Sequence, residues 1–279
     1  MKNTRLKGFM MGIMLGLVML AAFQGVSIAG DVLMMATTTS TDNTGLLEYL
    51  QPKFQAATGI EWRWTATGTG KALEMGKNCD VDVLMVHAPA AEMKFVEEGF
   101  GTDRRSIMYN DFVIIGPASD PAGIKGKSNK EALTAIAKAK AVFASRGDNS
   151  GTHKKELSLW KAADLPVPEK EDWYVQTGQG MLATINIAAE RNGYTMTDRG
   201  TYIKYEDNMG GNPPLKIMVE GDAALLNPYA VIAVNPAHCP KVNNKAAEAF
   251  IDWIVSPEAQ KAIGDFKLLG KALFTPDAK

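Results

Sequence analysis

Short apolar runs alternate along the chain with longer segments in which apolar residues recur every three or four positions. The runs predict strands at Val32–Ala36, Ile60–Ala66 and Asp80–His87. The longer segments predict helices at Gly45–Thr58, Gly70–Met75 and Pro89–Glu98. A strand followed by a helix, repeated in this way, predicts a parallel or mixed sheet that is covered by helices on both faces.

The alternation continues through the rest of the chain. It predicts a strand at Ala141–Ala144 and helices at Lys130–Lys140, Thr152–Ala163, Gly180–Glu190, Asn244–Val255 and Pro257–Phe266. Two further apolar strands, Asn110–Gly116 and Tyr229–Val234, end in Pro-containing turns and frame the middle block.

We interpret those two strands as crossovers between two lobes. The first lobe would consist of residues 30–112 and 232–279, and the second lobe of residues 113–231. The predicted fold class is therefore α/β, with two lobes, two hinge crossovers and a ligand cleft between the lobes. One continuous αβ domain with an insertion is the alternative.

The first 29 residues have the pattern of a secretory signal peptide. Three basic residues precede the apolar run Gly8–Phe23, and Ser27 and Ala29 place small side chains before cleavage after Ala29. A membrane anchor is the rival interpretation, but the run is shorter than the roughly 20 apolar residues of a spanning helix. The sequence thus predicts an exported chain, most simply one in a bacterial periplasm.

Composition narrows the function. The chain is 46% apolar and 22% charged, as in ordinary soluble proteins. Its formal charge is −1, which becomes −4 without the three bases of the first 29 residues. Nucleic-acid binders favour a basic face, so no nucleic-acid partner is expected. For an anionic ligand, the attraction must come from local groups.

The two cysteines, Cys79 and Cys239, lie far apart in the sequence. An exported pair can form a disulfide, but the sequence also allows two unrelated, partly buried thiols. Neither cysteine stands with His87 or His238 in the spacing of zinc ligands. We therefore expect no metal cation and no cofactor.

Four loop-to-helix junctions are rich in small hydroxyl and glycine residues: Thr37–Ser40, Gly68–Gly70, Ser145–Thr152 and Gln176–Met181. A helix start has unpaired N–H groups and a partial positive charge, which makes it a ready anion site. In αβ proteins, ligands bind at the carboxyl ends of strands, where such junctions meet. The pattern therefore predicts an anion site.

The third junction is the most informative. Arg146 offers a charged fork of donors, and Ser150, Gly151 and Thr152 add hydroxyls and accessible N–H groups. An ordinary helix cap is the simpler interpretation, but it explains only one hydroxyl. We predict that Arg146→Ala loses most of the anion affinity while the fold survives.

The first junction has more hydroxyls than a helix cap needs. We expect one of Thr39, Ser40 and Thr41 to cap the following helix, and Thr39 and Ser40 to contact the anion. The other polar residues of the junction are expected to shape the loop: Thr37, Thr38, Asp42 and Thr44.

Several stretches together resemble one known family. They include TTTSTDNTGLL, VDVLMVHAP, SRGDNSGTHKKELSLWK, TGQGM, TDRGTY and NPYAVIAVNP, and they span essentially the whole chain after residue 30. These stretches closely resemble the tungstate-binding proteins of bacterial tungstate ABC importers, which have the type II periplasmic binding protein fold. Phosphate-binding proteins share only the R-x-D-x-S-G-T core, and molybdate-binding proteins have comparable serines at the positions of Ser40 and Thr69.

The resemblance implies capture of tungstate and its delivery to the membrane permease subunits of an ABC importer by a monomer. Tungstate carries no proton at neutral pH, so its site should supply donors only. The residues expected to bind it are Thr39, Ser40, Thr69, Gly70, Arg146, Ser150, Gly151 and Thr152. Thr38, Asp148 and Gly178 are expected to support them, with Asp148 pairing with Arg146.

Other functions remain open at this point. Molybdate has the same charge and nearly the same size as tungstate, so residue types do not separate the two. Sulfate and phosphate are further candidates. An exported serine hydrolase, with His153 as the base for Ser150 or Ser40, is the alternative from another class, although no acid near His153 in the sequence would orient it.

Overall fold

The computed structural model describes residues 31–278. The predicted signal peptide and its cleavage site after Ala29 lie outside the described residues. Within residues 31–278, no helix is both long and apolar enough to cross a membrane.

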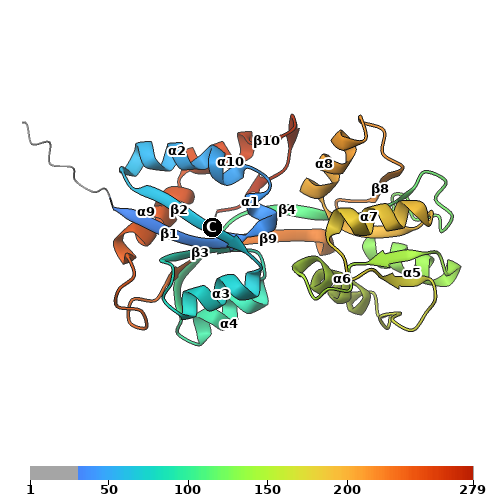
Figure 1. The fold of residues 1–279 in the computed structure, drawn as a ribbon, viewed down its shortest axis with the longest axis horizontal. Coiled ribbons are helices and arrows are strands. Elements are labelled where there is room, and N and C mark those ends of the chain that lie inside the picture. The colour runs from blue at the N-terminus through green and yellow to red at the C-terminus, as the bar shows by residue number, and fades with distance from the viewer. Residues whose placement is uncertain (1–30, 279) are drawn as a thin grey trace, which may run out of the picture. The chain divides into compact units, whose positions relative to one another are not determined.

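One mixed sheet of ten strands runs through these residues, in the order β2-β1-β3-β9-β4-β7-β5-β6, with β8 and β12 also paired to β4 (Figure 1). Its strands are β1 (Val32–Thr38), β2 (Glu61–Thr67), β3 (Val83–Val86), β4 (Gly101–Pro117), β5 (Phe143–Ser145), β6 (Tyr174–Gln176), β7 (Tyr194–Asp198), β8 (Leu215–Val219), β9 (Leu226–Val234) and β12 (Thr275–Pro276). A separate short hairpin pairs β10 (Lys267–Leu268) with β11 (Lys271–Ala272).

Strand β4 divides this sheet into two halves. Up to Asp111 it pairs with β9, and from Phe112 it pairs with β7 and β8. We call the strands β1, β2, β3, β9 and β12 the first half, and the strands β5, β6, β7 and β8 the second half. β9 pairs with β4 over Leu226–Val234 and with β3 over Ala230–Ala233.

Both faces of the sheet are buried, and alternation along the strands explains why. In β1, Leu33 and Met35 belong to one apolar cluster, whereas Met34 and Ala36 pack in the cluster on the other face. Strands β3 and β9 alternate in the same way, and so does β4 in the second half. Strands buried on both faces read as continuous apolar runs, which is the pattern that the sequence shows.

Helices cover each face. The helices are α1 (Thr39–Asp42), α2 (Leu46–Thr58), α3 (Thr69–Lys77), α4 (Pro89–Glu97), α5 (Asn129–Ala139), α6 (Gly151–Ala162), α7 (Met181–Glu190), α8 (Arg199–Asn208), α9 (Asn244–Ile254) and α10 (Pro257–Asp265), with one 3-10 turn at Ala223–Leu225. In the first half, α2, α9 and α10 pack on one face and α3 and α4 on the other (Figure 1). In the second half, α5 and α6 lie opposite α7 and α8.

The predicted α/β class with a mixed sheet is therefore confirmed. The predicted helices are present, with ends that differ mostly by one or two residues. The predicted elements did not include α1, β6, β7, α8, β8, the 3-10 turn or the short strands β10, β11 and β12. These segments are short, and several mix aromatic and polar residues, so neither periodicity stands out.

The open question about the cysteines is settled in favour of a disulfide. Cys79 and Cys239 are bonded, with their Cα atoms 5.4 Å apart. The bond joins the end of α3 to the loop that follows β9. It therefore holds one of the candidate anion-binding helices to the strand that leads back into the first half.

Candidate functional site

The predicted site residues gather at the carboxyl ends of strands from both halves. Two cavities lie there, of about 710 Å³ and about 480 Å³, and they are neighbours, because Gly151 lines the first and the next residue, Thr152, lines the second. The larger is lined by Thr69, Gly70, Ser150 and Gly151, and the smaller by Thr39, Ser40, Arg146 and Thr152. Every residue predicted to bind the anion therefore lines one of the two cavities, and each cavity has walls from both halves.

The first junction is capped differently from the prediction. Thr38, not Thr39, Ser40 or Thr41, is the N-cap of α1, and its Oγ1 accepts a hydrogen bond from the Thr41 N–H at 3.3 Å. The reason is that β1 stays extended through Thr38 and the chain turns into a helix at once. α2 has its own cap at Gly45, which makes no side-chain hydrogen bond.

The hydroxyls of this junction fall into two groups. Thr37, Thr41 and Thr44 are buried, Thr37 donates to the Met85 carbonyl at 2.8 Å, and Thr44 donates to the Thr41 carbonyl at 2.6 Å. Thr39 is exposed and Ser40 is half-buried, and both face the smaller cavity. The buried group shapes the loop, and the second group is left to meet a ligand.

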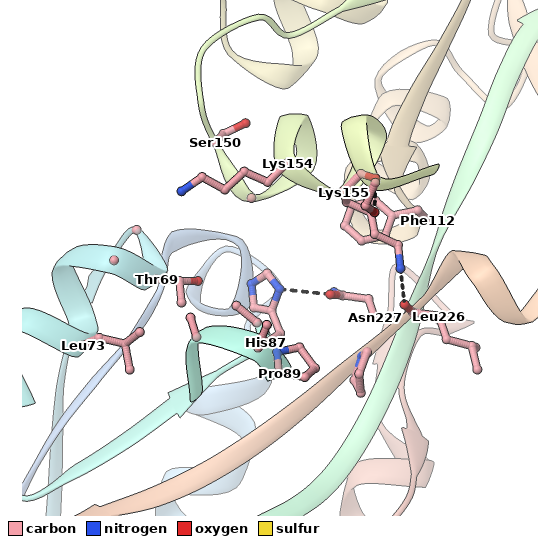
Figure 2. A pocket seen from close by; sticks show the side chains of 18 of the residues that line it. Thr69, Leu73, His87, Pro89, Phe112, Ser150, Lys154, Lys155, Leu226 and Asn227 are labelled. Carbon is pink, nitrogen blue, oxygen red and sulfur yellow. Dashed lines mark hydrogen bonds between the residues drawn. The ribbon is translucent and has the colours of Figure 1, made fainter. Parts of the chain in front are cut away.

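His87, at the end of β3, is a site residue that the sequence analysis considered only as a zinc ligand. Its Nε2 lies 3.1 Å from Thr38 Oγ1 and 3.2 Å from Ser40 Oγ, and its Nδ1 lies 3.0 Å from Asn227 Oδ1 (Figure 2). Burial lowers the pKa of His87, although the Asn227 hydrogen bond and the charge of Asp198 act in the other direction. A polar residue at the carboxyl end of a buried strand was the available signal.

The start of α3 presents backbone donors. Its N-cap is Gly68, which has no side chain to satisfy the first N–H groups of the helix. Thr69 adds a half-buried hydroxyl, and a Cβ on Gly70 would meet nothing within 4 Å, so a ligand has access to the backbone. Figure 2 shows Thr69 on the opposite side of the larger cavity from Ser150.

The loop before α6 needs unusual backbone conformations. Gly147 has φ +60°, and Asn149 also has φ +60°. A Cβ on Gly147 would lie 2.8 Å from the Cβ of Gln176 in β6. Glycine is therefore required at residue 147 by both conformation and space, and this turn directs Arg146 into the smaller cavity.

Arg146 is held by the predicted partner. Its Nη2 donates to Asp148 Oδ2, and Asp148 Oδ1 accepts from the Ser150 N–H at 3.1 Å. Burial raises the pKa of Asp148, but the hydrogen bonds from Ser150 and the Arg146 charge outweigh it, so the pKa lies below its usual value. Arg146 Nε is buried and has no hydrogen-bond partner among residues 31–278.

Hydrogen bonds from two other segments hold the start of the loop that carries Arg146. The Gly178 N–H donates to the Arg146 carbonyl at 2.8 Å, so this predicted supporting residue does contact the loop. Buried Glu156 accepts from Ser145 Oγ at 2.6 Å and from Tyr174 OH at 2.6 Å, which ties β5, β6 and α6 together. The loop is therefore anchored at its start.

Three helices that start at the cavities, α3, α6 and α7, have no acidic residue at the N-cap or in the first turn, whereas α1, α4 and α8 also start there and carry Asp42, Glu92 and the N-cap Asp198. α6 instead carries Lys154 and Lys155 just after its N-cap Ser150, and both line the larger cavity (Figure 2). Acids normally stabilise helix starts, so the starts of α3, α6 and α7 are the ones open to an external anion.

Two charged residues of the smaller cavity were not predicted. Asp198, the N-cap of α8, and Lys204 line the smaller cavity, and Lys204 donates to the Asn43 carbonyl at the end of α1. Asp198 accepts from the Thr201 N–H and hydroxyl, so both of its oxygens are occupied. The D-x-x-T spacing of an N-cap was the available signal for Asp198.

The hydrolase alternative with His153 has no support in the geometry. His153 Nδ1 accepts from the Asn149 N–H at 3.0 Å, and Ser150 Oγ accepts from the His153 N–H, so the residues form a helix start and not a catalytic pair. Ser40, His87 and Asn227 do lie in the order of nucleophile, base and orienting group. However, Asn227 is a neutral amide and offers no charge to stabilise an imidazolium.

Comparisons with known proteins agree with this geometry. A family model described as a PBP superfamily domain matches residues 26–258. The chain is 54% identical over 240 residues to the tungstate-binding protein TupA of Campylobacter jejuni, which covers 86% of this chain and 89% of that protein.

Solved structures are similar as well. The tungstate-binding protein TupA of Desulfovibrio alaskensis G20 is 70% identical, with a TM-score of 0.88, and the match covers 90% of this chain and all of that chain. A tungstate ABC transporter structure from Geobacter sulfurreducens is 48% identical, with a TM-score of 0.73, over 84% of this chain and 98% of that chain.

Proposed function

The chain belongs to the PBP superfamily and to the family of the tungstate-binding proteins TupA, and on that premise we propose that it captures tungstate for an ABC importer. The ligand would lie where the two cavities adjoin, between the starts of α1 and α3 from one side and the Arg146 loop and α6 from the other.

One observation carries this proposal. Arg146 directs a guanidinium into a cavity that it shares with Thr39, Ser40 and Thr152, and its buried Nε has no partner among the described residues. A buried N–H without an acceptor is unfavourable by about 1–3 kcal/mol, and more for a charged group. An oxyanion supplies that acceptor and accepts from the neighbouring hydroxyls as well.

The supply of acceptors favours a dianion without a proton. Phosphate keeps a proton at neutral pH, so its site benefits from a free carboxylate. The two carboxylates of this region are both engaged, Asp148 with Arg146 and Ser150, and Asp198 with Thr201. Tungstate and molybdate need donors only, which is what the residues predicted to bind the anion offer. Molybdate remains the alternative ligand, because its charge and shape are nearly the same.

Delivery to a transporter follows from binding by both halves. We infer that the halves act as lobes, residues 30–112 with 232–279 and residues 113–231, and that an anion held by both closes the cleft between them. Closure excludes water and strengthens each charge-assisted hydrogen bond. Membrane permease subunits would then recognise the closed form. The chain would act in the periplasm, as a monomer and without catalysis or a cofactor.

Calorimetry on the protein without residues 1–29 tests the proposal. Tungstate, molybdate, sulfate and phosphate are titrated separately at neutral pH, and we expect one site per chain with affinity in the order of tungstate, molybdate, then the other two. Several charge-assisted bonds, less the cost of association, give roughly nanomolar affinity, about −12 kcal/mol. Preference for phosphate would contradict the tungstate assignment, and failure to bind any of the four would contradict the whole proposal.

A further inference from the structure

His87 connects the anion-facing hydroxyls of the first half to both strands at the middle of the sheet. On one side its Nε2 contacts Thr38 and Ser40, and on the other its Nδ1 contacts Asn227 of β9. Asn227 in turn donates from Nδ2 to Asn110 Oδ1 of β4 at 2.7 Å. Neither His87 nor Asn227 is needed to cap the β1–α1 turn, because Thr38 already caps it.

The chain of contacts fixes the tautomer of the ring. Because Asn227 Nδ2 donates to Asn110, its Oδ1 faces His87 and acts as an acceptor. His87 Nδ1 must then be the protonated nitrogen. In a neutral ring, Nε2 is left as an acceptor that faces two hydroxyl oxygens.

This acceptor competes with a ligand. Thr38 and Ser40 have one hydroxyl hydrogen each, and their oxygens are 3.0 Å apart. While His87 is neutral, one of these hydrogens must point to Nε2. A protonated ring reverses that bond, because Nε2–H donates toward the oxygens and the Ser40 hydroxyl hydrogen becomes free for an oxyanion, while buried Thr38 Oγ1 keeps Thr41 Oγ1 as a partner at 2.7 Å.

We propose that His87 takes up a proton at Nε2 from the solvent when the dianion binds, and so turns the Ser40 hydroxyl toward the anion. This inference rests on the proposed function. His87 would be a positioning residue, because it acts through Ser40 and through its charge. In the unliganded protein, burial keeps the ring neutral, as the lowered pKa indicates.

The charges around His87 allow its ring to be protonated once an anion is bound. The charge of Asp198 favours the protonated form, and the ring of Tyr229 lies 4.7 Å from the His87 ring. Buried Glu92 of α4 is paired with Arg104 and accepts from the Ala88 N–H, so it is engaged elsewhere. The cations that share the two cavities oppose protonation until an anion offsets them: Arg146, Lys154, Lys155 and Lys204.

Binding should therefore depend on pH with a defined sign. His87 has a pKa below its usual value without ligand, and a nearby dianion raises it. Between the two pKa values about one proton is taken up, so affinity falls by up to about tenfold per pH unit as pH rises, and it levels off above the liganded pKa.

The experiment measures tungstate affinity by calorimetry from pH 6.5 to 9, in HEPES and in Tris, whose different ionisation enthalpies report proton uptake. The variants are His87→Gln, which keeps a polar side chain but does not titrate, and two controls, His153→Gln near the site and His238→Gln beside the disulfide. NMR of the wild-type imidazoles with and without tungstate reports the His87 protonation directly, whether or not His87→Gln folds.

We expect proton uptake in the wild type and in His238→Gln, and little uptake and a flat pH profile in His87→Gln. Uptake that persists in His87→Gln and disappears in His153→Gln would overturn the inference. Wild-type binding with no uptake and a neutral His87 ring would overturn it too, while leaving the proposed function intact. If the wild type binds no oxyanion at all, it is the proposed function that fails.

Discussion

The two halves of the molecule build their sides of the site by different means. In the first half, the β1–α1 junction has no cation facing the ligand, and its hydroxyls are positioned by hydrogen bonds among themselves and with His87. In the second half, the loop before α6 relies on a guanidinium paired with a carboxylate and on a positive-φ glycine. The first side is neutral and prearranged, whereas the second is charged and conformationally strained.

This difference separates two tasks. A charge attracts a dianion over several ångströms but does not discriminate well between anions, whereas oriented hydroxyls act only at contact distance and fix the geometry. The neutral side also contains fully buried hydroxyl residues, Thr37 and Thr41, which do not face the cavity. Substitutions on the two sides should therefore have different effects on affinity and stability.

The largest effect is expected on the charged side. Arg146→Ala removes a guanidinium that can make two charge-assisted bonds at about 1.5–3 kcal/mol each, so tungstate affinity should fall by at least about 100-fold. Arg146→Lys keeps the charge but not the planar guanidinium, so its tungstate affinity should lie between those of the wild type and Arg146→Ala. Calorimetry measures the affinities, and thermal melts check the fold.

Arg105→Ala is the matched control, because Arg105 is also paired with a carboxylate two residues away, Asp103, but lies on the surface. It should leave the affinity unchanged. Equal affinity in Arg146→Ala and the wild type would remove Arg146 from the site.

On the neutral side, affinity and stability should separate. Ser40→Ala removes a hydroxyl that faces the cavity, which should reduce affinity by about 10- to 100-fold with little change in melting temperature. Thr37→Val removes the donor to the buried Met85 carbonyl, which should cost about 1–3 kcal/mol of stability while affinity is kept. Calorimetry measures the affinity, and denaturant unfolding measures the stability. Lost affinity in Thr37→Val together with lost stability in Ser40→Ala would contradict this division of the hydroxyls.

The sequence predicted features that depend on local interactions and did not predict contacts between residues that are far apart in the chain. The α/β class was predictable because strands buried on both faces are continuous apolar runs, as Val83–Val86 is. The Arg146–Asp148 pair was predictable because the partners are two residues apart. His87, Asn227 and Asn110 were not found, because their contacts join residues up to 140 positions apart. The cap at Thr38 was missed because it depends on where β1 stops being extended.

Strain on the charged side can be tested at Gly147. Gly147→Ala introduces a Cβ at positive φ and within 2.8 Å of Gln176, so we expect a loss of about 1–3 kcal/mol in stability and roughly tenfold in affinity, because Arg146 shifts. Gly123→Ala is the control, since it also has positive φ but meets nothing within 4 Å. It should lose a little stability and no affinity. If both variants behaved alike, contact with Gln176 would not be what positions the loop.

The smallest effect is expected at Asp148, where two consequences of one substitution oppose each other. Asp148→Asn frees the Arg146 guanidinium to move, which weakens binding, but it also removes a negative charge close to the dianion, which strengthens binding. We expect a net loss of only a few-fold, because the guanidinium must be held in place before its charge is useful. A gain in affinity would mean that the repulsion between Asp148 and the dianion outweighs the benefit of holding Arg146.

The pH dependence of stability reports what the ionised Asp148 carboxylate contributes through Ser150 and Arg146. The pKa of Asp148 is below its usual value, so the wild type should be more stable than Asp148→Asn at neutral pH. That difference should shrink as pH falls below about 4 and through the lowered pKa, because the carboxylate is then protonated in both the folded and the unfolded state. Thermal melts of both proteins over that range measure it, and a constant difference would mean that the ionised Asp148 carboxylate does not stabilise the fold through Ser150 and Arg146.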